Sequence, residues 1–437
     1  MCYYSLMTPE ISTLSNGLRV LSVPNKSVET VNVMFLTSIG SREEEDRNLG
    51  IAHFLEHMAF KGTPTRPNPI EINREIERLG ARTNAFTWQE YTGYFIQGNK
   101  AHLAKYLDIL SDIYLNSTFP ETEMEKEKGV IIEEIKLHKD EPMYRASDLF
   151  FAATFGGTVL GRSILGSEET IKKMTREDFV EFRGKHAPEN TIIAVAGNTN
   201  TEDVIENVDE IGRWKVEDRR WKIEDRRWGV EKNRKTELLL ETRKSEQSHF
   251  RLGIKTCNLF SNLVPVCDVL SAHIGSGLGS MMFETLREKM GAAYYCASSD
   301  IYYKDVGVLK LSAGVATNRL EESLKRVIEE IMEIGEIGIG EKQLERAKEY
   351  IKGGLFMGME TTEGANGYYA FDLLLKGRLE EPVSYAHKID LVTNEDIIKF
   401  VRSIFKPENL SLAVVGDYSD NVKLTSLLRL WLRQESG

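Results

Sequence analysis

The sequence predicts an α+β fold made of two homologous α/β-sandwich halves. The segment PENTIIAVAGN at 188–198 recurs in the second half as PENLSLAVVGD at 407–417. Each copy follows a similar helical segment, REDFVEFRGKHA in the first case and NEDIIKFVRSIFK in the second. Both copies are typical of a helix, a turn at Pro-Glu-Asn and a buried strand that ends at glycine. A match of this length at corresponding places indicates a duplicated unit of roughly 200 residues.

A charged segment separates the two copies. In WKVEDRRWKIEDRRWGVEKNR, residues 214–234, three tryptophans stand seven positions apart and charged residues fill most other positions. This pattern is typical either of an amphipathic helix whose tryptophan stripe docks on a surface or of a solvated linker. In both cases it marks a domain boundary. The predicted parts are an N-terminal half at 1–212, a linker at 213–235 and a C-terminal half at 236–437.

Composition restricts the partners and the compartment. The 437 residues include 56 basic and 67 acidic side chains, and the formal charge of -11 disfavours nucleic acid and anionic membranes as main partners. No run of residues reaches the roughly 18 apolar positions that a membrane-spanning helix needs. The N-terminal MCYYSLMTPE also lacks the pattern of a signal peptide. We therefore expect a cytoplasmic protein that binds neither nucleic acid nor membranes.

The first half opens with two strand patterns, at 18–25 and 31–40. A helix is expected after Asn68, which is a suitable N-cap followed by proline at the first helical position, and it should stop near Gly80. The next segment, ARTNAFTWQEYTGYF at 81–95, has the composition of a strand.

Between these elements, IAHFLEHMAFKGT at 51–63 places titratable groups in an apolar run. His53 and His57 are four positions apart, so on a helix their imidazoles project from one face and can share a metal ion. Glu56 lies beside them. A catalytic zinc site with two histidines needs a third protein ligand and leaves the fourth position to water. The sequence therefore predicts a metal site whose third ligand comes from elsewhere in the chain.

Candidates for the third ligand lie in EMEKEKGVIIEEIKLHKDEP, residues 123–142. On a helix Glu127 and Glu134 share one face, with apolar residues between them. A carboxylate buried among such residues would be costly unless it is paired or bound to a metal. His138 shares the face of Glu134 and is a rival ligand. Spacing within this segment does not choose between them.

The stretch HFLEHMAFKGT resembles the zinc site of the pitrilysin-type, or M16, metallopeptidases, whose inverted H-x-x-E-H order defines the inverzincins. It is similar to the corresponding stretch in the catalytic subunit of mitochondrial processing peptidase. In that family the third ligand is a glutamate 76 or 77 positions after the second histidine, with another glutamate seven positions before it. The resemblance implies Glu134 as ligand and Glu127 as the supporting carboxylate, with Glu133 as the fallback ligand.

The resemblance also implies a role for each of these residues. His53, His57 and Glu134 would hold one zinc ion per chain, and Glu56 would act as the general base. Glu127 would orient a ligand histidine or the metal-binding helix. Asn84 and Ala85 correspond to an edge strand at the zinc, to which an extended peptide can add as a further strand.

In the second half the positions that match the two histidines in the repeat are Ala272 and Ser276, so the metal site is absent there. The family contributes an arginine and a tyrosine seven apart from this half, which implies Arg287 and Tyr294 in LREKMGAAY. Tyr294 would stabilise the oxyanion and Arg287 would bind substrate carbonyl groups. Tyr295 is the near competitor. Read without the family, GSGLGS at 275–280 is a glycine turn, because it lacks the fingerprints of a nucleotide-binding loop.

Together these features predict a zinc endopeptidase whose two halves form a clamshell around a peptide chamber. The expected substrates are short or unfolded peptides in an extended conformation, including leader or presequence peptides. We expect a homodimer, with a self-sufficient monomer as the alternative. The competing functions are a non-catalytic scaffold, as in relatives built into respiratory complexes, and a peptide-binding module without turnover.

Overall fold

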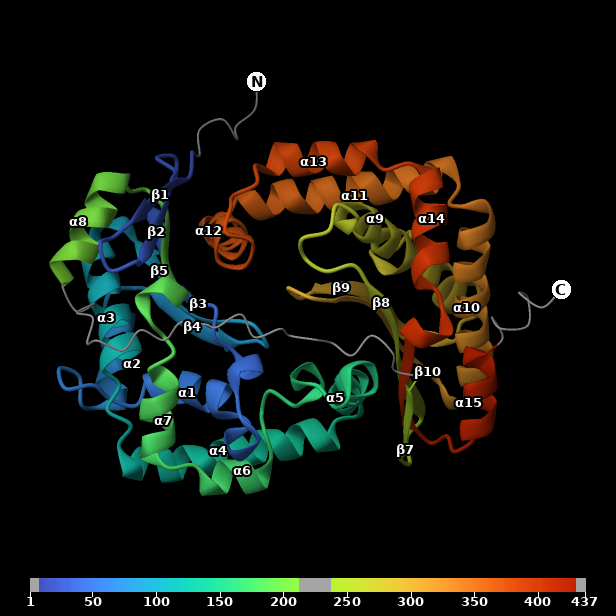
Figure 1. Cartoon of the computed structure of the whole chain (residues 1–437), viewed down its shortest axis with the longest axis horizontal. Coiled ribbons are helices and arrows are strands. Elements are labelled where there is room, and N and C mark those ends of the chain that lie inside the picture. The colour runs from blue at the N-terminus through green and yellow to red at the C-terminus, as the bar shows by residue number, and fades with distance from the viewer. Residues whose placement is uncertain (1–7, 212–236, 430–437) are drawn as a thin grey trace. The chain divides into compact units, whose positions relative to one another are not determined.

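The structure is a computed structural model that describes residues 8–211 and 237–429 (Figure 1). The predicted tryptophan-bearing linker at 213–235 lies outside the described residues. By residue contacts the chain divides into two compact units. Within the described residues, the first unit comprises 8–136, 163–211 and 357–380, and the second comprises 137–162, 237–356 and 381–429.

A six-stranded sheet forms the centre of the first unit, with the order β1-β2-β6-β3-β5-β4. Strands β2 and β6 are parallel and the other neighbours are antiparallel. β6 is buried along its whole length, as its run of apolar residues predicts. The strands are β1 (Glu10–Thr13), β2 (Arg19–Pro24), β3 (Thr30–Thr37), β4 (Arg82–Thr87), β5 (Thr92–Asn99) and β6 (Thr191–Gly197).

The second unit repeats this arrangement in a five-stranded sheet with the order β7-β11-β8-β10-β9. β11 corresponds to β6, because each directly follows the repeated Pro-Glu-Asn turn and each pairs in parallel with one neighbour. The α+β class and the duplicated unit predicted from the sequence are therefore confirmed. The strands are β7 (Glu237–Thr242), β8 (Gln247–Thr256), β9 (Ala293–Tyr302), β10 (Gly307–Ala316) and β11 (Leu410–Gly416).

Helices cover both faces of the first sheet. α2 (Pro69–Arg78), α3 (Leu103–Asn116) and α8 (Thr201–Ile211) bury their apolar residues with one face, and α12 (Thr362–Phe371) covers the other (Figure 1). A third apolar cluster joins α1 (Ile51–Ala59), α4 (Glu121–Asp140), α6 (Glu168–Lys173) and α7 (Arg176–Arg183). This last cluster is the one that positions the histidine-bearing helix α1.

The second sheet packs its main core against helices of the second half. That core includes residues of α9 (Val264–Gly275), α10 (Leu320–Ile337), α14 (Asn394–Ile404) and α15 (Asn421–Leu428). Further helices of the second half include α11 (Glu341–Met359), α13 (Pro382–Leu391) and the π-helix η7 (Phe283–Lys289). No helix in the described ranges combines the length and apolar character that a bilayer crossing requires.

The helices that precede the duplicated strands also correspond. Thr175 caps α7 and Thr393 caps α14, and each threonine forms a capping box with an aspartate three positions later. Such a box satisfies the free backbone N–H groups at a helix start, so it fixes where both helices begin.

The two halves exchange one helix. α12 comes from the second half of the sequence but packs on the first sheet, where Asn366 donates from Nδ2 to the carbonyl oxygens of Asn32 and Ala194, each at 3.1 Å. α5 (Pro142–Phe155) comes from the first half but packs on β8 and β11 of the second sheet. The starts of the two helices are separated by nearly the same offset as the duplicated strands, so they occupy corresponding places in the duplication. Each compact unit therefore contains one helix from the other half of the sequence, so its bounds differ from those of the predicted halves.

Candidate metal centre

α1 carries the HxxEH motif on a helix anchored by its apolar residues. Ile51, Phe54 and Met58 are buried in the cluster shared with α4 and α7, while His53, Glu56 and His57 are partly exposed. The helical period places these three polar residues on the face opposite much of that packing.

The start of α1 is fixed by an acidic side chain that precedes it. Glu44 accepts from the backbone N–H groups of Gly50 and Ala52, each at 2.9 Å. Gly50 has φ +93°, and a Cβ there would lie 2.6 Å from the Leu165 carbonyl oxygen, so glycine is required. A buried carboxylate at a helix N-terminus is also stabilised by the helix dipole.

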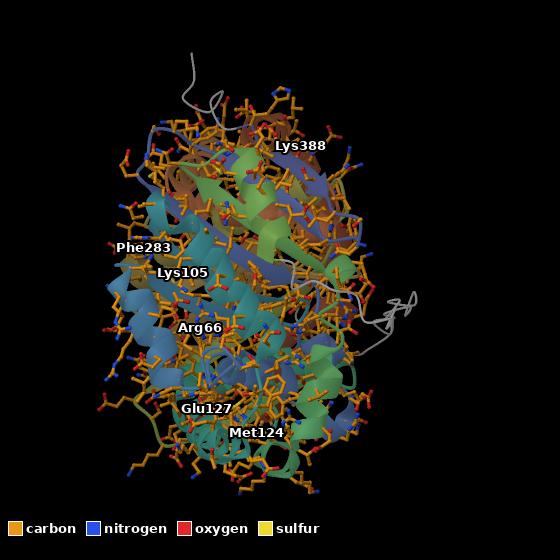
Figure 2. All side chains as sticks on the ribbon, turned by 90° about the vertical axis from the view of Figure 1, so that its left-hand side faces the viewer. Arg66, Lys105, Met124, Glu127, Phe283 and Lys388 are labelled. Carbon is orange, nitrogen blue, oxygen red and sulfur yellow. The ribbon has the colours of Figure 1, made fainter. Side chains whose placement is uncertain are left out.

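The loop after α1 is fixed by Arg66, which is labelled in Figure 2. Its guanidinium donates to Glu75 of α2 at 2.6 Å and to Asp112 of α3 at 2.7 Å. Thr63 also donates to Asp112, at 2.6 Å. These charge-assisted bonds hold the segment after α1, as Glu44 holds the segment before it, so the histidine-bearing helix is anchored at both ends.

His53, His57 and Glu134 come together as one group. Their donor atoms all lie within 4.8 Å of one another. The two Nε2 atoms are 3.2 Å apart, and Glu134 Oε2 is 3.8 Å from Nε2 of His53 and 4.0 Å from Nε2 of His57. The two histidines come from α1 and the glutamate from α4, so the group joins segments that are far apart in sequence.

This donor set fits a zinc ion. Two nitrogens bound tetrahedrally to one zinc at its usual bond length lie about 3.3–3.4 Å apart, close to the separation of the imidazoles. Glu134 lies roughly half an ångström beyond that spacing, and its carboxylate is partly exposed. Two histidines and one carboxylate are the ligand set of a catalytic rather than a structural zinc, since one position stays open.

Glu127, two turns before Glu134 on α4, supports the site. His57 Nδ1 lies 2.8 Å from Glu127 Oε1, and Lys61 Nζ lies 2.6 Å from Oε2. Burial raises the pKa of Glu127, but the hydrogen bonds from His57 and Lys61 outweigh it and leave that pKa lowered. The ionised carboxylate therefore accepts the Nδ1–H of His57, which leaves Nε2 as the free lone pair that faces His53. Figure 2 also labels Glu127.

We expect Glu127→Ala to weaken zinc binding about 10–100-fold, the usual cost of removing a hydrogen-bonding partner of a metal ligand. Competition with a chromophoric chelator measures this affinity. Glu125→Ala is the matched control on the same helix, because Glu125 is exposed and pairs with Lys128. Equal zinc affinities of the two variants would contradict the supporting role of Glu127.

Glu56 is held by the first sheet. Thr87, at the end of β4, donates to Glu56 Oε2 at 2.5 Å. Burial is the largest influence on the pKa of Glu56 and raises it, Glu134 raises it further, and the hydrogen bond from Thr87 and the charge of His57 reduce the rise. A carboxylate with a raised pKa close to a metal group is suited to accept a proton and release it again.

The predicted substrate strand lies at an edge. β4 is the last strand of the first sheet and pairs only with β5 within the described residues. Asn84 is exposed and Ala85 is partly buried on this strand. The outer edge of β4 has backbone groups with no strand beside them in the described part of the chain, which is the arrangement that strand addition uses.

The rival ligands point elsewhere. Glu133 has an exposed side chain and pairs with Lys136 at 2.7 Å. His138 stacks on Tyr144 with ring centroids 4.7 Å apart, and its Nδ1 is 3.9 Å from Asp148. Neither belongs to the group of His53, His57 and Glu134.

Arg287 and Tyr294 lie in the second unit. Tyr294 occupies a β-bulge, because Ala293 and Tyr295 pair with consecutive residues of β10, and its side chain is 73% exposed. Arg287, in η7, donates to the Tyr294 carbonyl oxygen at 2.9 Å. Tyr295 instead accepts from Arg251 at 2.8 Å, so its hydroxyl is already engaged. Bulges commonly redirect a side chain at functional sites.

Ala272, at one of the positions that correspond to the histidines, is buried in α9.

Sequence reasoning missed three supporting residues, which are Glu44, Lys61 and Thr87. Lys61 stands within the motif stretch, and only its contact with Glu127 gives it a role. Thr87 follows Ala85 by two positions, so strand alternation could have placed both on one face. Glu44 lies outside the usual capping spacing, and its local sequence contains no signal for its contact with α1.

Comparison with known proteins gives consistent matches over most of the chain. Residues 19–168 match the family described as Insulinase (Peptidase family M16), and residues 173–351 match the Peptidase M16 inactive domain. An uncharacterized zinc protease of Bacillus subtilis, YmxG, is 32% identical over 406 residues, covering 92% of this chain and 97% of the relative. One from Rickettsia felis is 32% identical over 415 residues, covering 93% and 97%.

Solved structures show the same fold. A protease from Helicobacter pylori superposes with a TM-score of 0.88 at 23% identity, covering 94% of this chain and all of the other. A peptidase M16 inactive domain structure from Pseudomonas fluorescens gives a TM-score of 0.86 at 16% identity, covering 94% and 98%.

Proposed function

The chain belongs to peptidase family M16, and we propose that it is a zinc-dependent endopeptidase that hydrolyses extended peptides. The observation that carries this proposal is the group of His53, His57 and Glu134 with their donor atoms within 4.8 Å. Glu56 lies on the same helix, one residue before His57. A scaffold would not need this set of ligands together with a partly buried carboxylate beside them.

In the proposed mechanism His53, His57 and Glu134 would hold zinc, which when bound would lower the pKa of a water molecule and polarise the scissile carbonyl. Glu56 accepts the proton of the attacking water and delivers it to the leaving amine. Thr87 fixes Oε2 of Glu56 by its hydrogen bond. The other carboxylate oxygen accepts no hydrogen bond from any residue that the structure describes, so it is the one that takes the proton.

Substrate binding is proposed at the edge of the first sheet. A peptide that adds beside β4 makes backbone hydrogen bonds whatever its sequence, and Asn84 and Ala85 are the positions for this contact. Arg287 and Tyr294 of the second unit are proposed to bind the substrate backbone and the developing oxyanion. The exposure of Tyr294 in its bulge supports this role.

The substrates we propose are short or unfolded peptides, because strand addition requires an extended backbone. Leader or presequence peptides belong to this class. The partners are therefore peptides rather than nucleic acids or membranes, and the acting species is a homodimer or a self-sufficient monomer.

Zinc removal tests the proposed function. We expect dialysis against a chelator to abolish cleavage of an unstructured fluorogenic peptide and stoichiometric zinc to restore it, because the proposed reaction needs zinc to activate the water molecule and to polarise the scissile carbonyl. Magnesium serves as the control, since it prefers oxygen ligands in octahedral geometry. Cleavage that persists in the metal-free protein would contradict the proposal.

A further inference from the structure

The duplication allows corresponding sheet positions to be compared. Ala194 of β6 and Ala413 of β11 occupy the same place in the repeated strand, and they pair with Met34 and Arg251 respectively. In the first sheet this face is an apolar layer sealed by α12, with Met34 buried in it. The second sheet has the buried cation Arg251 at the same place.

The strand next to β8 also carries polar residues where the first sheet has apolar or small ones. Lys310 of β10 pairs with Gly253 of β8 and corresponds to Gly93 of the first sheet. Ser312, which pairs with Arg251, corresponds to the apolar Phe95. α5 covers β7, β11 and β8 on this face, and it leaves Ala297 of β9 exposed. The second copy has therefore replaced an apolar layer with a polar and basic one.

Arg251 has no anionic partner within the described part of the chain. It is only 5% exposed, and its guanidinium donates to the carbonyl oxygens of Phe250 and Met143 and to the hydroxyl of Tyr295. All three acceptors are neutral. The Tyr295 hydroxyl is also 3.0 Å from Nδ1 of His249. A buried charge without a counter-charge is costly, which makes this cluster unusual for a purely structural layer.

Lys310 adds a second cation beside the first. Lys310 is two positions from Ser312, the partner of Arg251, so both cations lie on the same face of neighbouring strands. Burial lowers the pKa of Lys310, and the positive charge of Arg251 lowers it further. The ammonium lies 5.9 Å from the ring centroid of Phe150, and no residue in the described ranges accepts a hydrogen bond from it. An anion placed here would relieve the repulsion and complete the hydrogen bonds of Lys310.

We propose that Lys310, Arg251 and Tyr295 form a binding site for a carboxylate group of a peptide, located on the second sheet. Lys310 provides the direct charged contact, Arg251 provides the buried charge behind it, and Tyr295 connects Arg251 to His249. A carboxylate is compact, carries one negative charge and accepts hydrogen bonds from ammonium and guanidinium donors.

The peptide nature of the ligand rests on the proposed peptidase function. Tyr295 follows Tyr294 directly on β9, the edge strand of this sheet, and Tyr294 is the residue proposed to contact the substrate. A peptide bound at this edge would thus have its C-terminal carboxylate or an acidic side chain within reach of the basic face.

The test measures peptide binding in the Glu56→Gln background, which avoids turnover. Three fluorescent peptides of the same length are compared by anisotropy: a free C-terminal acid, a C-terminal amide, and an amide with one internal glutamate. We expect at least one carboxylate-bearing peptide to bind on the order of tenfold more tightly than the plain amide. Tighter binding of the free acid would identify the C-terminal carboxylate as the ligand, and tighter binding of the glutamate peptide would identify an acidic side chain.

Lys310→Met should reduce this preference to within about twofold, because it removes the charge and keeps the side-chain bulk. Lys310→Arg should retain the preference. Lys325→Met is the matched control, since Lys325 is an exposed lysine of the same unit that pairs with Glu329. Equal binding of all three peptides, or an unchanged preference in Lys310→Met, would overturn the assignment. If the wild type cuts no peptide but the preference is present, the peptidase proposal fails and the carboxylate site stands.

Discussion

Glu56→Gln is expected to lose peptide cleavage and to retain zinc. The amide has nearly the same shape and can still interact with Thr87, but it cannot accept the proton of the attacking water. General-base catalysis contributes about 10²–10⁴-fold to such reactions, so the loss in kcat should fall in that range or above it. Initial rates on a quenched fluorescent peptide measure the loss, and zinc content is determined on the same protein.

Glu77→Gln is the matched control for this variant. Glu77 is an exposed glutamate of α2, so the same chemical change there should leave both activity and zinc unchanged. If Glu56→Gln lost its zinc, Glu56 would be acting as a ligand rather than as a base. Retained turnover would exclude it from the catalytic step.

Glu134→Gln is expected to release zinc where the adjacent Glu133→Gln does not. Glu134 is the carboxylate that faces both imidazoles, whereas Glu133 is exposed and paired with Lys136. The loss of a direct ligand should weaken zinc binding by more than the roughly 10–100-fold that a change in a supporting residue costs. Competition titrations of both variants against one chelator measure the difference.

The comparison of Glu133→Gln with Glu134→Gln also tests the rotation of α4 about its own axis. If Glu133→Gln lost zinc and Glu134→Gln kept it, the helix would have to be rotated about its axis by roughly one residue, or 100°. That rotation would also remove Glu127 from His57. Parallel loss in both variants would instead indicate a general disturbance of α4, which circular dichroism would reveal.

The histidine-bearing helix α1 could be predicted from the sequence because its signal is local. His53 and His57 are one helical turn apart, and the 3.6-residue period alone places them on one face. The duplication could also be recognised, since the buried strands β6 and β11 both follow Pro-Glu-Asn and share an Ala-Val pair and a final glycine at matching positions. The choice of Glu134 needed the family spacing, because local periodicity cannot tell which distant carboxylate meets the histidines.

Features that depend on tertiary packing could not be predicted. The exchange of α5 and α12 between the two sheets has no local signature, because the residues of a helix do not indicate which of two similar sheets it packs on. The contact of Lys61 with Glu127 and that of Thr87 with Glu56 join segments far apart in the chain. The basic cluster around Arg251 becomes visible only when strand register aligns it with Met34 of the first sheet.

The most direct test of the zinc-peptidase account measures zinc content and cleavage of a mixed peptide pool on the same preparations of wild type and Glu56→Gln. Mass spectrometry over time identifies each product. The account predicts about one zinc ion per chain in both proteins and new peptide ends with the wild type alone. Two zinc-loaded proteins that both leave the pool intact, or both cut it equally, would contradict the account.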